Sequence, residues 1–216
     1  MIAERTIKRY QKSNAAALRE VIEAVVHFLL GILVCRGVIF NNLAPFGASY
    51  VAAVPRKKLI WSVAGASVGY IILNPSQPFR YVAVTIAIAV VRWTLEDVKL
   101  LSRSILYAPV AAFLPIFASG IAMMFVSTST LAYFSTIIIE ALLAGGAAYF
   151  LRKSLALVDE GRHISSLTQS EMACIVLAGC VAMLSLGSIE IESVSLGRIL
   201  SVALIMTCAQ IGRAHV

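Results

Sequence analysis

Eight long apolar segments make up most of this sequence, and they limit the folds that the chain can adopt. They are Val21–Phe40, Leu43–Val54, Leu59–Leu73, Tyr81–Trp93, Ile105–Val126, Leu131–Leu151, Met172–Leu186 and Leu196–Ile211. None alternates apolar and polar residues as an outer-membrane β-strand does. The run IIIEALLAGGAAYFL, for example, is apolar on every side of a helix except at Glu140. This pattern favours helices over strands.

The amount of apolar side chain indicates that lipid, not water, surrounds the chain. Of the 216 residues, 60% are hydrophobic and 13% are charged, whereas soluble domains have about 45–50% apolar and about 25% charged residues. A soluble protein of this size could not remove so much apolar surface from water, which excludes a soluble enzyme, a disordered tail and a secreted disulfide scaffold. Because a backbone in lipid must satisfy its own hydrogen bonds, the sequence predicts an all-α fold, a polytopic transmembrane helical bundle of about eight spans.

The segments differ in how well they match the thickness of a bilayer. A helix needs about 20 residues to cross a hydrocarbon core of roughly 30 Å. The first, fifth and sixth segments have this length, but the second, third, fourth and seventh are short. They cross only if they recruit flanking residues or lie where the protein thins the bilayer. The second, Leu43–Val54, is the weakest candidate for a span.

The positions of Lys and Arg predict the orientation, because cytoplasmic connections carry an excess of these residues. Fifteen of the 18 fall in the N-terminal segment, in alternate connections and after the eighth segment; Arg36, Arg80 and Arg198 are the exceptions. We therefore expect eight spans in a bacterial inner membrane with both termini cytoplasmic. We divide the chain into a basic cytoplasmic segment (1–20), a transmembrane domain (21–210) that looks incomplete, and a tail (211–216) that resembles a cloning adaptor.

The sequence lacks the motifs that are typical of several functional classes. The net charge of +7 comes from short basic clusters between apolar runs, which does not indicate nucleic-acid binding. The chain has no Gly-rich phosphate loop, no HExxH and no GxSxG. Its two aspartates, Asp97 and Asp159, lie in connections, and its four cysteines lie in apolar runs without CxxC spacing. We expect no catalytic residue, no metal site and no cofactor in this chain.

Glu140 is the polar residue that the sequence marks most clearly, because it lies near the middle of the sixth segment. A carboxylate there costs about 2.5–3.5 kcal/mol on insertion scales. It should be protonated, paired with a cation such as Arg36, or facing a water-filled cavity. Two interpretations stay open: a hydrogen bond between helices that fixes their packing, and a carboxylate that couples ions or contacts a ligand.

Small residues at helical spacing mark candidate contacts between helices. Gly65 and Gly69 form a GxxxG pattern in the third segment, and Ala141 and Gly145 form a looser pattern in the sixth. Such residues let helix backbones approach closely in lipid. They suggest packing faces, and with them possible self-association, without naming a partner.

The run HFLLGILVCRGVIFNNLAPFGASYVAAV, residues 27–54, resembles the start of the membrane domain of the stage II sporulation protein E family. That family has a hydrophobic helix ending in an Arg-containing element, a short linker, and an APFG stretch followed by small residues. The matching residues here are Arg36, Ala44, Pro45, Phe46, Gly47, Ala48, Ala52 and Ala53. The family pattern has about ten membrane helices, so eight segments would be an incomplete domain.

The resemblance implies a membrane-anchoring and localising domain of a sporulation phosphatase. In that family a multi-span region anchors the protein at the asymmetric septum of endospore-forming bacteria, and a cytoplasmic region contacts the tubulin-like division protein. A terminal phosphatase domain that uses Mn or Mg acts on an anti-sigma-factor antagonist; none of its residues is present here. The expected partners are the bilayer, further copies of the chain, and division proteins through the missing region.

A small transport subunit, such as the substrate-binding membrane component of a vitamin importer, is the alternative from another class. Such proteins share this size, hydrophobicity and basic balance. Transport predicts a polar-lined cavity around Glu140, with broken helices near the midplane. Anchoring predicts a filled interior in which Glu140 bonds to a neighbouring helix.

Overall fold

The computed structural model describes residues 2–40, 43–73, 77–95, 104–126, 131–161, 166–187, 189–191 and 194–213. Within these ranges the chain is almost entirely helical, as predicted, and each apolar segment contributes one helix. A two-stranded hairpin, β1 (Glu190–Ile191) with β2 (Val194–Ser195), joins the last two helices. The helices are α1 (Ile2–Val34), α2 (Pro45–Ala53), α3 (Leu59–Leu73), α4 (Pro78–Leu95), α6 (Tyr107–Val126), α7 (Leu131–Asp159), α8 (Gln169–Gly187) and α9 (Leu196–Arg213).

The predicted number of spans is not confirmed. Among the described residues, four helices are long and apolar enough to cross a membrane, at Pro78–Leu95, Tyr107–Phe125, Tyr133–Asp159 and Gln169–Gly187. Helix α3 has 15 residues and is therefore about 22 Å long, shorter than the hydrocarbon core. Residues 214–216 of the expected tail lie outside the described part of the chain.

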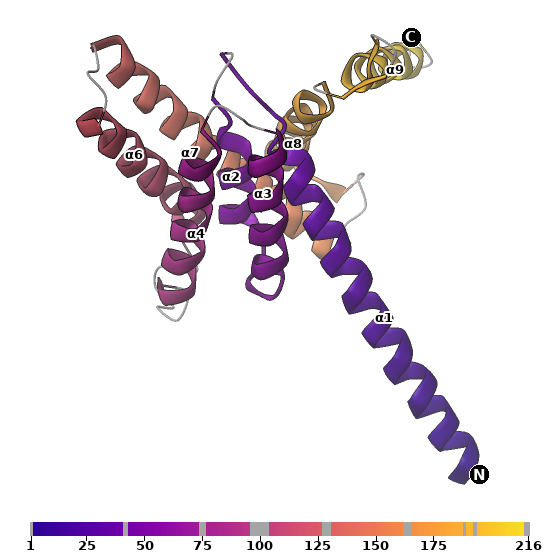
Figure 1. Cartoon of the computed structure of the whole chain (residues 1–216). Coiled ribbons are helices and arrows are strands. Elements are labelled where there is room, and N and C mark those ends of the chain that lie inside the picture. Colours follow the sequence, from indigo (N-terminus) through magenta and orange to yellow (C-terminus); the bar gives the residue numbers. More distant parts are fainter. Residues whose placement is uncertain are drawn as a thin grey trace.

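The helices surround a short central element (Figure 1). Helix α2 lies inside the bundle and contacts α7, α4, α6 and α3. Helix α1 packs along α3 and then extends far beyond the bundle toward the N-terminus at the bottom of the view. Helices α6 and α7 form a long antiparallel pair, and α9 lies at the top of the view beyond the end of α8. We call the end with the 3-10 turn Arg56–Lys58 the lower end, and the end with Pro78 the upper end.

Helix α2 is short because prolines border it. Pro45 occupies its first turn, where a missing N–H costs nothing. At the other end Val54 is extended, with φ −64° and ψ 145°, as expected for a residue before a proline such as Pro55. With nine residues the helix is about 14 Å long, which is shorter than the hydrocarbon core of a bilayer, so the span predicted for Leu43–Val54 is not confirmed.

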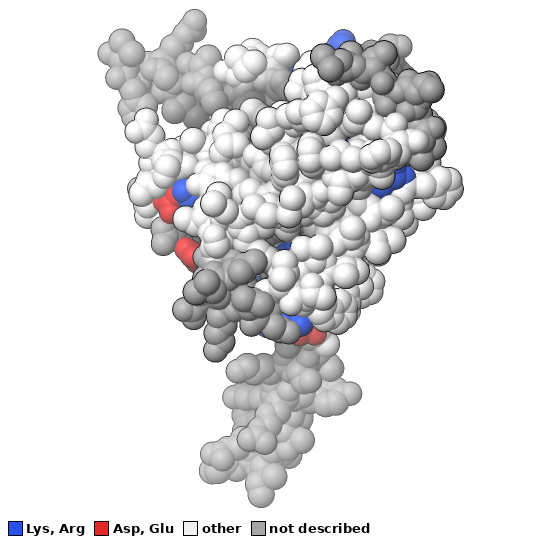
Figure 2. All heavy atoms as spheres, turned by 90° about the vertical axis from the view of Figure 1, so that its left-hand side faces the viewer, with Lys and Arg blue, Asp and Glu red and all other residues white. Residues whose placement is uncertain are grey.

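The exterior of the bundle is apolar, in keeping with a membrane protein. Figure 2 shows the side that carries α4, α6 and α7, on which charged side chains are sparse. Large apolar side chains that are at least half exposed on these helices include Ile86, Val90, Leu114, Phe125 and Leu142. In water such a surface would be an interaction site or an aggregation hazard, whereas in lipid it is the expected exterior.

The glycines predicted to pack helices lie in close backbone contacts. A methyl group added at Gly65 would lie 2.1 Å from the carbonyl oxygen of Phe28 on α1, and one at Gly69 would lie 3.0 Å from Ile32. On α7, Ala141 is fully buried, and a methyl group at Gly145 would lie 3.3 Å from the carbonyl oxygen of Pro109 on α6. The α1–α3 crossing is thus the tighter of the two.

Candidate functional site

All nine residues of α2 are buried, and polar side chains bind both of its ends. At the upper end, the hydroxyl of Tyr70 accepts the N–H of Ala48 at 3.0 Å and donates to the carbonyl of Ala44 at 2.7 Å. The N–H of Ala44 donates to the hydroxyl of Tyr81 at 3.1 Å. Two tyrosines from α3 and α4 therefore bind the N-terminus of α2. The Tyr81 hydroxyl satisfies the N–H of the capping residue Ala44, which has no partner inside the helix, and the Tyr70 hydroxyl binds two backbone groups of the first turn.

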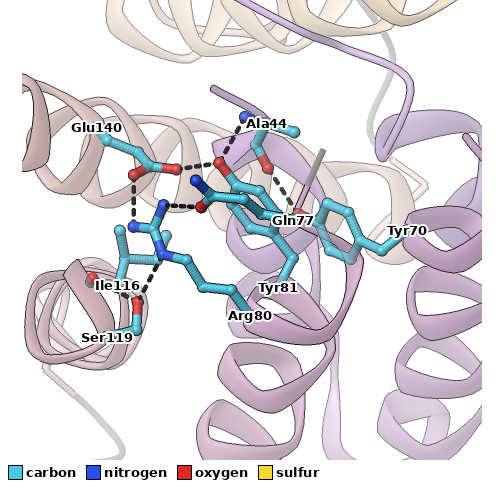
Figure 3. Close-up of polar contacts among 8 residues, drawn as sticks. All are labelled: Ala44, Tyr70, Gln77, Arg80, Tyr81, Ile116, Ser119 and Glu140. Atoms are coloured by element: carbon cyan, nitrogen blue, oxygen red, sulfur yellow. Dashed lines mark hydrogen bonds and ion pairs between the residues drawn. The ribbon is translucent and has the colours of Figure 1, made fainter. Parts of the chain in front are cut away.

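A buried ion pair lies beside Tyr81, on the side away from Tyr70 (Figure 3). Nη2 of Arg80 on α4 donates to Oε2 of Glu140 on α7 at 2.7 Å, and the hydroxyl of Tyr81 donates to Oε1 of the same carboxylate. The two charged side chains are 8% and 1% exposed. Arg80 also donates from Nη1 to Gln77 at 3.1 Å and from Nε to Ser119 on α6 at 3.3 Å. The network thereby links α4, α6 and α7 to the N-terminus of α2.

The partner of Glu140 is therefore Arg80 and not Arg36, the cation that the sequence suggested. Arg36 follows α1 in a turn, where its N–H donates to the carbonyl of Leu33 at 3.0 Å. A cavity of about 220 Å³ opens beside the ion pair. Its lining includes Gln77, Arg80 and Glu140 from the network, together with Phe40, Leu43, Tyr133, Thr136 and Ile137.

An arginine binds the lower end of α2. Nη1 of Arg92, on the last turn of α4, donates to the carbonyl of Val51 at 2.9 Å and to that of Val54. Arg92 is 3% exposed, and its own carbonyl accepts the hydroxyl of Tyr107 at 3.1 Å. The carbonyl end of a helix carries partial negative charge, which a buried cation neutralises.

The residues that carry the family resemblance belong to this central helix and its approach. Pro45 begins α2, and Phe46 is buried against residues that include Val34 and Tyr50. A methyl group added at Gly47 would lie 2.3 Å from Sγ of Cys35 and 2.6 Å from the hydroxyl of Tyr70. Glycine at this position therefore lets α2 approach both α3 and the end of α1.

Sequence reasoning missed most of the polar residues that bind α2. The sequence did not single out Tyr70 or Tyr81, and Arg80 entered only as an exception to the distribution of Lys and Arg. Arg92 did carry a signal, because it lies inside the apolar segment Tyr81–Trp93, and an ionisable residue in such a segment usually has a partner. The arrangement as a whole binds both ends of one short buried helix.

Replacing Tyr70 with Phe is expected to lower the free energy of unfolding by about 2 kcal/mol, because the buried N–H of Ala48 and the buried carbonyl of Ala44 each lose one hydrogen bond. Thermal unfolding of the purified chain in detergent measures this loss. Tyr149→Phe is the matched control, since Tyr149 is half-buried on α7 and lines a cavity with Ile105 and Arg152. Equal stability of the two variants would contradict the role assigned to the Tyr70 hydroxyl.

Comparison with known proteins identifies one family. The family model described as SpoIIE, N-terminal domain, matches residues 2–216. No curated protein and no solved structure matches the chain. The match includes the APFG stretch with which α2 begins and all of the residues that bind its two ends. This chain belongs to the SpoIIE N-terminal domain family.

Proposed function

We propose that the chain is the membrane-anchoring and localising domain of a sporulation phosphatase of the SpoIIE type. It holds a cytoplasmic catalytic region, which lies outside these residues, at the membrane of the division septum. The lower end of the bundle faces the cytoplasm, because the basic residues Arg56, Arg92, Arg152 and Lys153 lie there. Division proteins contact the cytoplasmic region, and small-residue helix faces provide for self-association within the bilayer.

The observation that carries this proposal is the complete burial of α2 together with the pairing of Glu140 inside the bundle. Each residue of α2 is buried, and Glu140 bonds to Arg80 and Tyr81 from a neighbouring helix. Anchoring requires a stably packed bundle and no ligand site at Glu140. A half-helix at membrane depth is tolerated where protein surrounds it, and here it serves as the element around which the other helices pack.

The transport alternative has less support. It requires a polar-lined cavity around Glu140, and the cavity there has a volume of about 220 Å³. Sites for vitamin-sized ligands occupy about 300–1,000 Å³ and enclose most of the ligand. The carboxylate oxygens of Glu140 are also already bound by Arg80 and Tyr81. The volume and the paired carboxylate both favour the anchor.

The proposal is tested by placing a fluorescent protein after the chain and expressing the fusion in a sporulating bacterium that lacks its own SpoIIE membrane domain. We expect the fluorescence at the asymmetric septum to exceed that of a control, an unrelated polytopic membrane protein with the same reporter. Even distribution of a membrane-inserted fusion along all membranes would contradict localisation by this domain.

A further inference from the structure

The lower end of the bundle contains a second cavity, of about 390 Å³, where α2 ends. Three arginines from separate parts of the chain line it: Arg56 from the 3-10 turn, Arg92 from α4 and Arg152 from α7. The rest of the lining is Ala53, Val54, Pro55, Leu155, Ala156, Asp159 and Glu160. The cavity therefore combines a cluster of guanidinium groups with apolar walls.

Contacts with the protein hold two of these arginines in place. Arg92 forms the buried floor, where its Nη1 binds the carbonyls of Val51 and Val54. The guanidinium of Arg152 lies 5.3 Å from the centre of the Tyr107 ring, within the range of a cation–π contact. Guanidinium groups that are already positioned lose little freedom when they bind an anion. Asp159 and Glu160 also line the cavity, at exposed positions where α7 ends.

An adjoining cavity of about 210 Å³ shares Arg152 and Ala156 with the cavity of about 390 Å³. Its other lining residues are Ile105, Tyr149 and Lys153, and Ile105 is 69% exposed on the outer surface of the bundle. Arg152 thus lies between a cavity rich in arginine and one that reaches the apolar exterior. A free anion would bind only in the cavity of about 390 Å³. A lipid could bind in both, with its phosphate in that cavity and its hydrocarbon in the adjoining cavity of about 210 Å³.

We propose that these two cavities bind an anionic phospholipid, with its phosphate between Arg56 and Arg152 and its glycerol and acyl region along Ile105 and Tyr149. Guanidinium groups bind phosphate oxygens through paired hydrogen bonds, and basic pockets between helices at the cytoplasmic side are suited to lipid headgroups. This site does not depend on septal localisation, so either proposal can fail without the other.

Quenching of tryptophan fluorescence by brominated lipid tests the site in the full chain. Trp93 follows Arg92 and is 57% exposed; Trp61→Phe removes the other tryptophan of the chain. In vesicles, brominated phosphatidylglycerol should quench Trp93 at a lower mole fraction than brominated phosphatidylcholine. Arg56→Gln and Arg152→Gln should each reduce this preference about fivefold, the contribution expected of one basic residue near the surface.

Arg198→Gln is the matched control, since it removes the same charge from an exposed residue of α9, outside both cavities. It should retain the preference for phosphatidylglycerol, and all three variants should unfold at the temperature of the parent. Equal quenching by the two lipids, or an equal loss in the Arg198 variant, would overturn the proposal. Displacement of the brominated lipid by millimolar inorganic phosphate would assign the site to a soluble phosphate and overturn its assignment to lipid.

Discussion

Replacing Glu140 with Leu is expected to lower the free energy of unfolding by about 3–5 kcal/mol. The carboxylate is 1% exposed and binds Arg80 at 2.7 Å, and removal of one partner of a buried pair leaves an uncompensated buried charge. The Tyr81 hydroxyl, which also holds the N-terminus of α2, loses its acceptor at the same time. Thermal or denaturant unfolding in detergent micelles measures the loss.

Further variants distinguish the charge from the hydrogen bonds. Glu140→Gln keeps an acceptor for Tyr81 but not the negative charge, so we expect a smaller loss, about 1.5–3 kcal/mol. The double variant Arg80→Leu with Glu140→Leu should recover part of the stability, because no charge is then left buried. Glu20→Gln, at an exposed position of α1, serves as the control and should be neutral. If Glu140→Leu were as stable as Glu20→Gln, the ion pair would not hold the bundle together.

The positions of the helices could be predicted because apolar runs end at charges and prolines. The segment Leu59–Leu73 has the same bounds as α3, since Arg56–Lys58 precede it. The environment of a helix was harder to predict. A segment that is apolar on all sides can either span a membrane or be buried in protein, and Leu43–Val54 was placed in the first class although α2 belongs to the second. Its length, with prolines at both ends, was the available signal.

In the network around Glu140, the sequence predicted the carboxylate but not its partners. The carboxylate itself stood out because one charge in an apolar segment is costly. Its partner did not, because Arg80 lies 60 positions away and only the packing of α4 against α7 brings the two together. The tyrosines gave no signal either, since a sequence does not distinguish a tyrosine whose buried hydroxyl caps a helix from a tyrosine at the membrane interface.

Replacing Gly65 with Ala is expected to cost about 3 kcal/mol or more, the upper part of the range for overpacking. The added methyl group would lie 2.1 Å from the carbonyl oxygen of Phe28 and 2.9 Å from its carbonyl carbon. These atoms belong to the backbone of α1, so no side-chain rotation relieves the clash and the two helices must separate. Hydrophobic contacts along the rest of the α1–α3 crossing are then lost as well.

Gly146→Ala on α7 is a control of the same chemistry, because a methyl group at Gly146 meets no atom within 4 Å. Alanine is the better helix former by about 0.8–1 kcal/mol, so this variant should be as stable as the parent or slightly more stable. The free energy of unfolding in detergent should therefore fall for Gly65→Ala and stay the same or rise slightly for Gly146→Ala. Equal effects would mean that α1 and α3 are not in backbone contact at Gly65, whereas a loss confined to Gly65→Ala would show that this crossing depends on the absence of a single side chain.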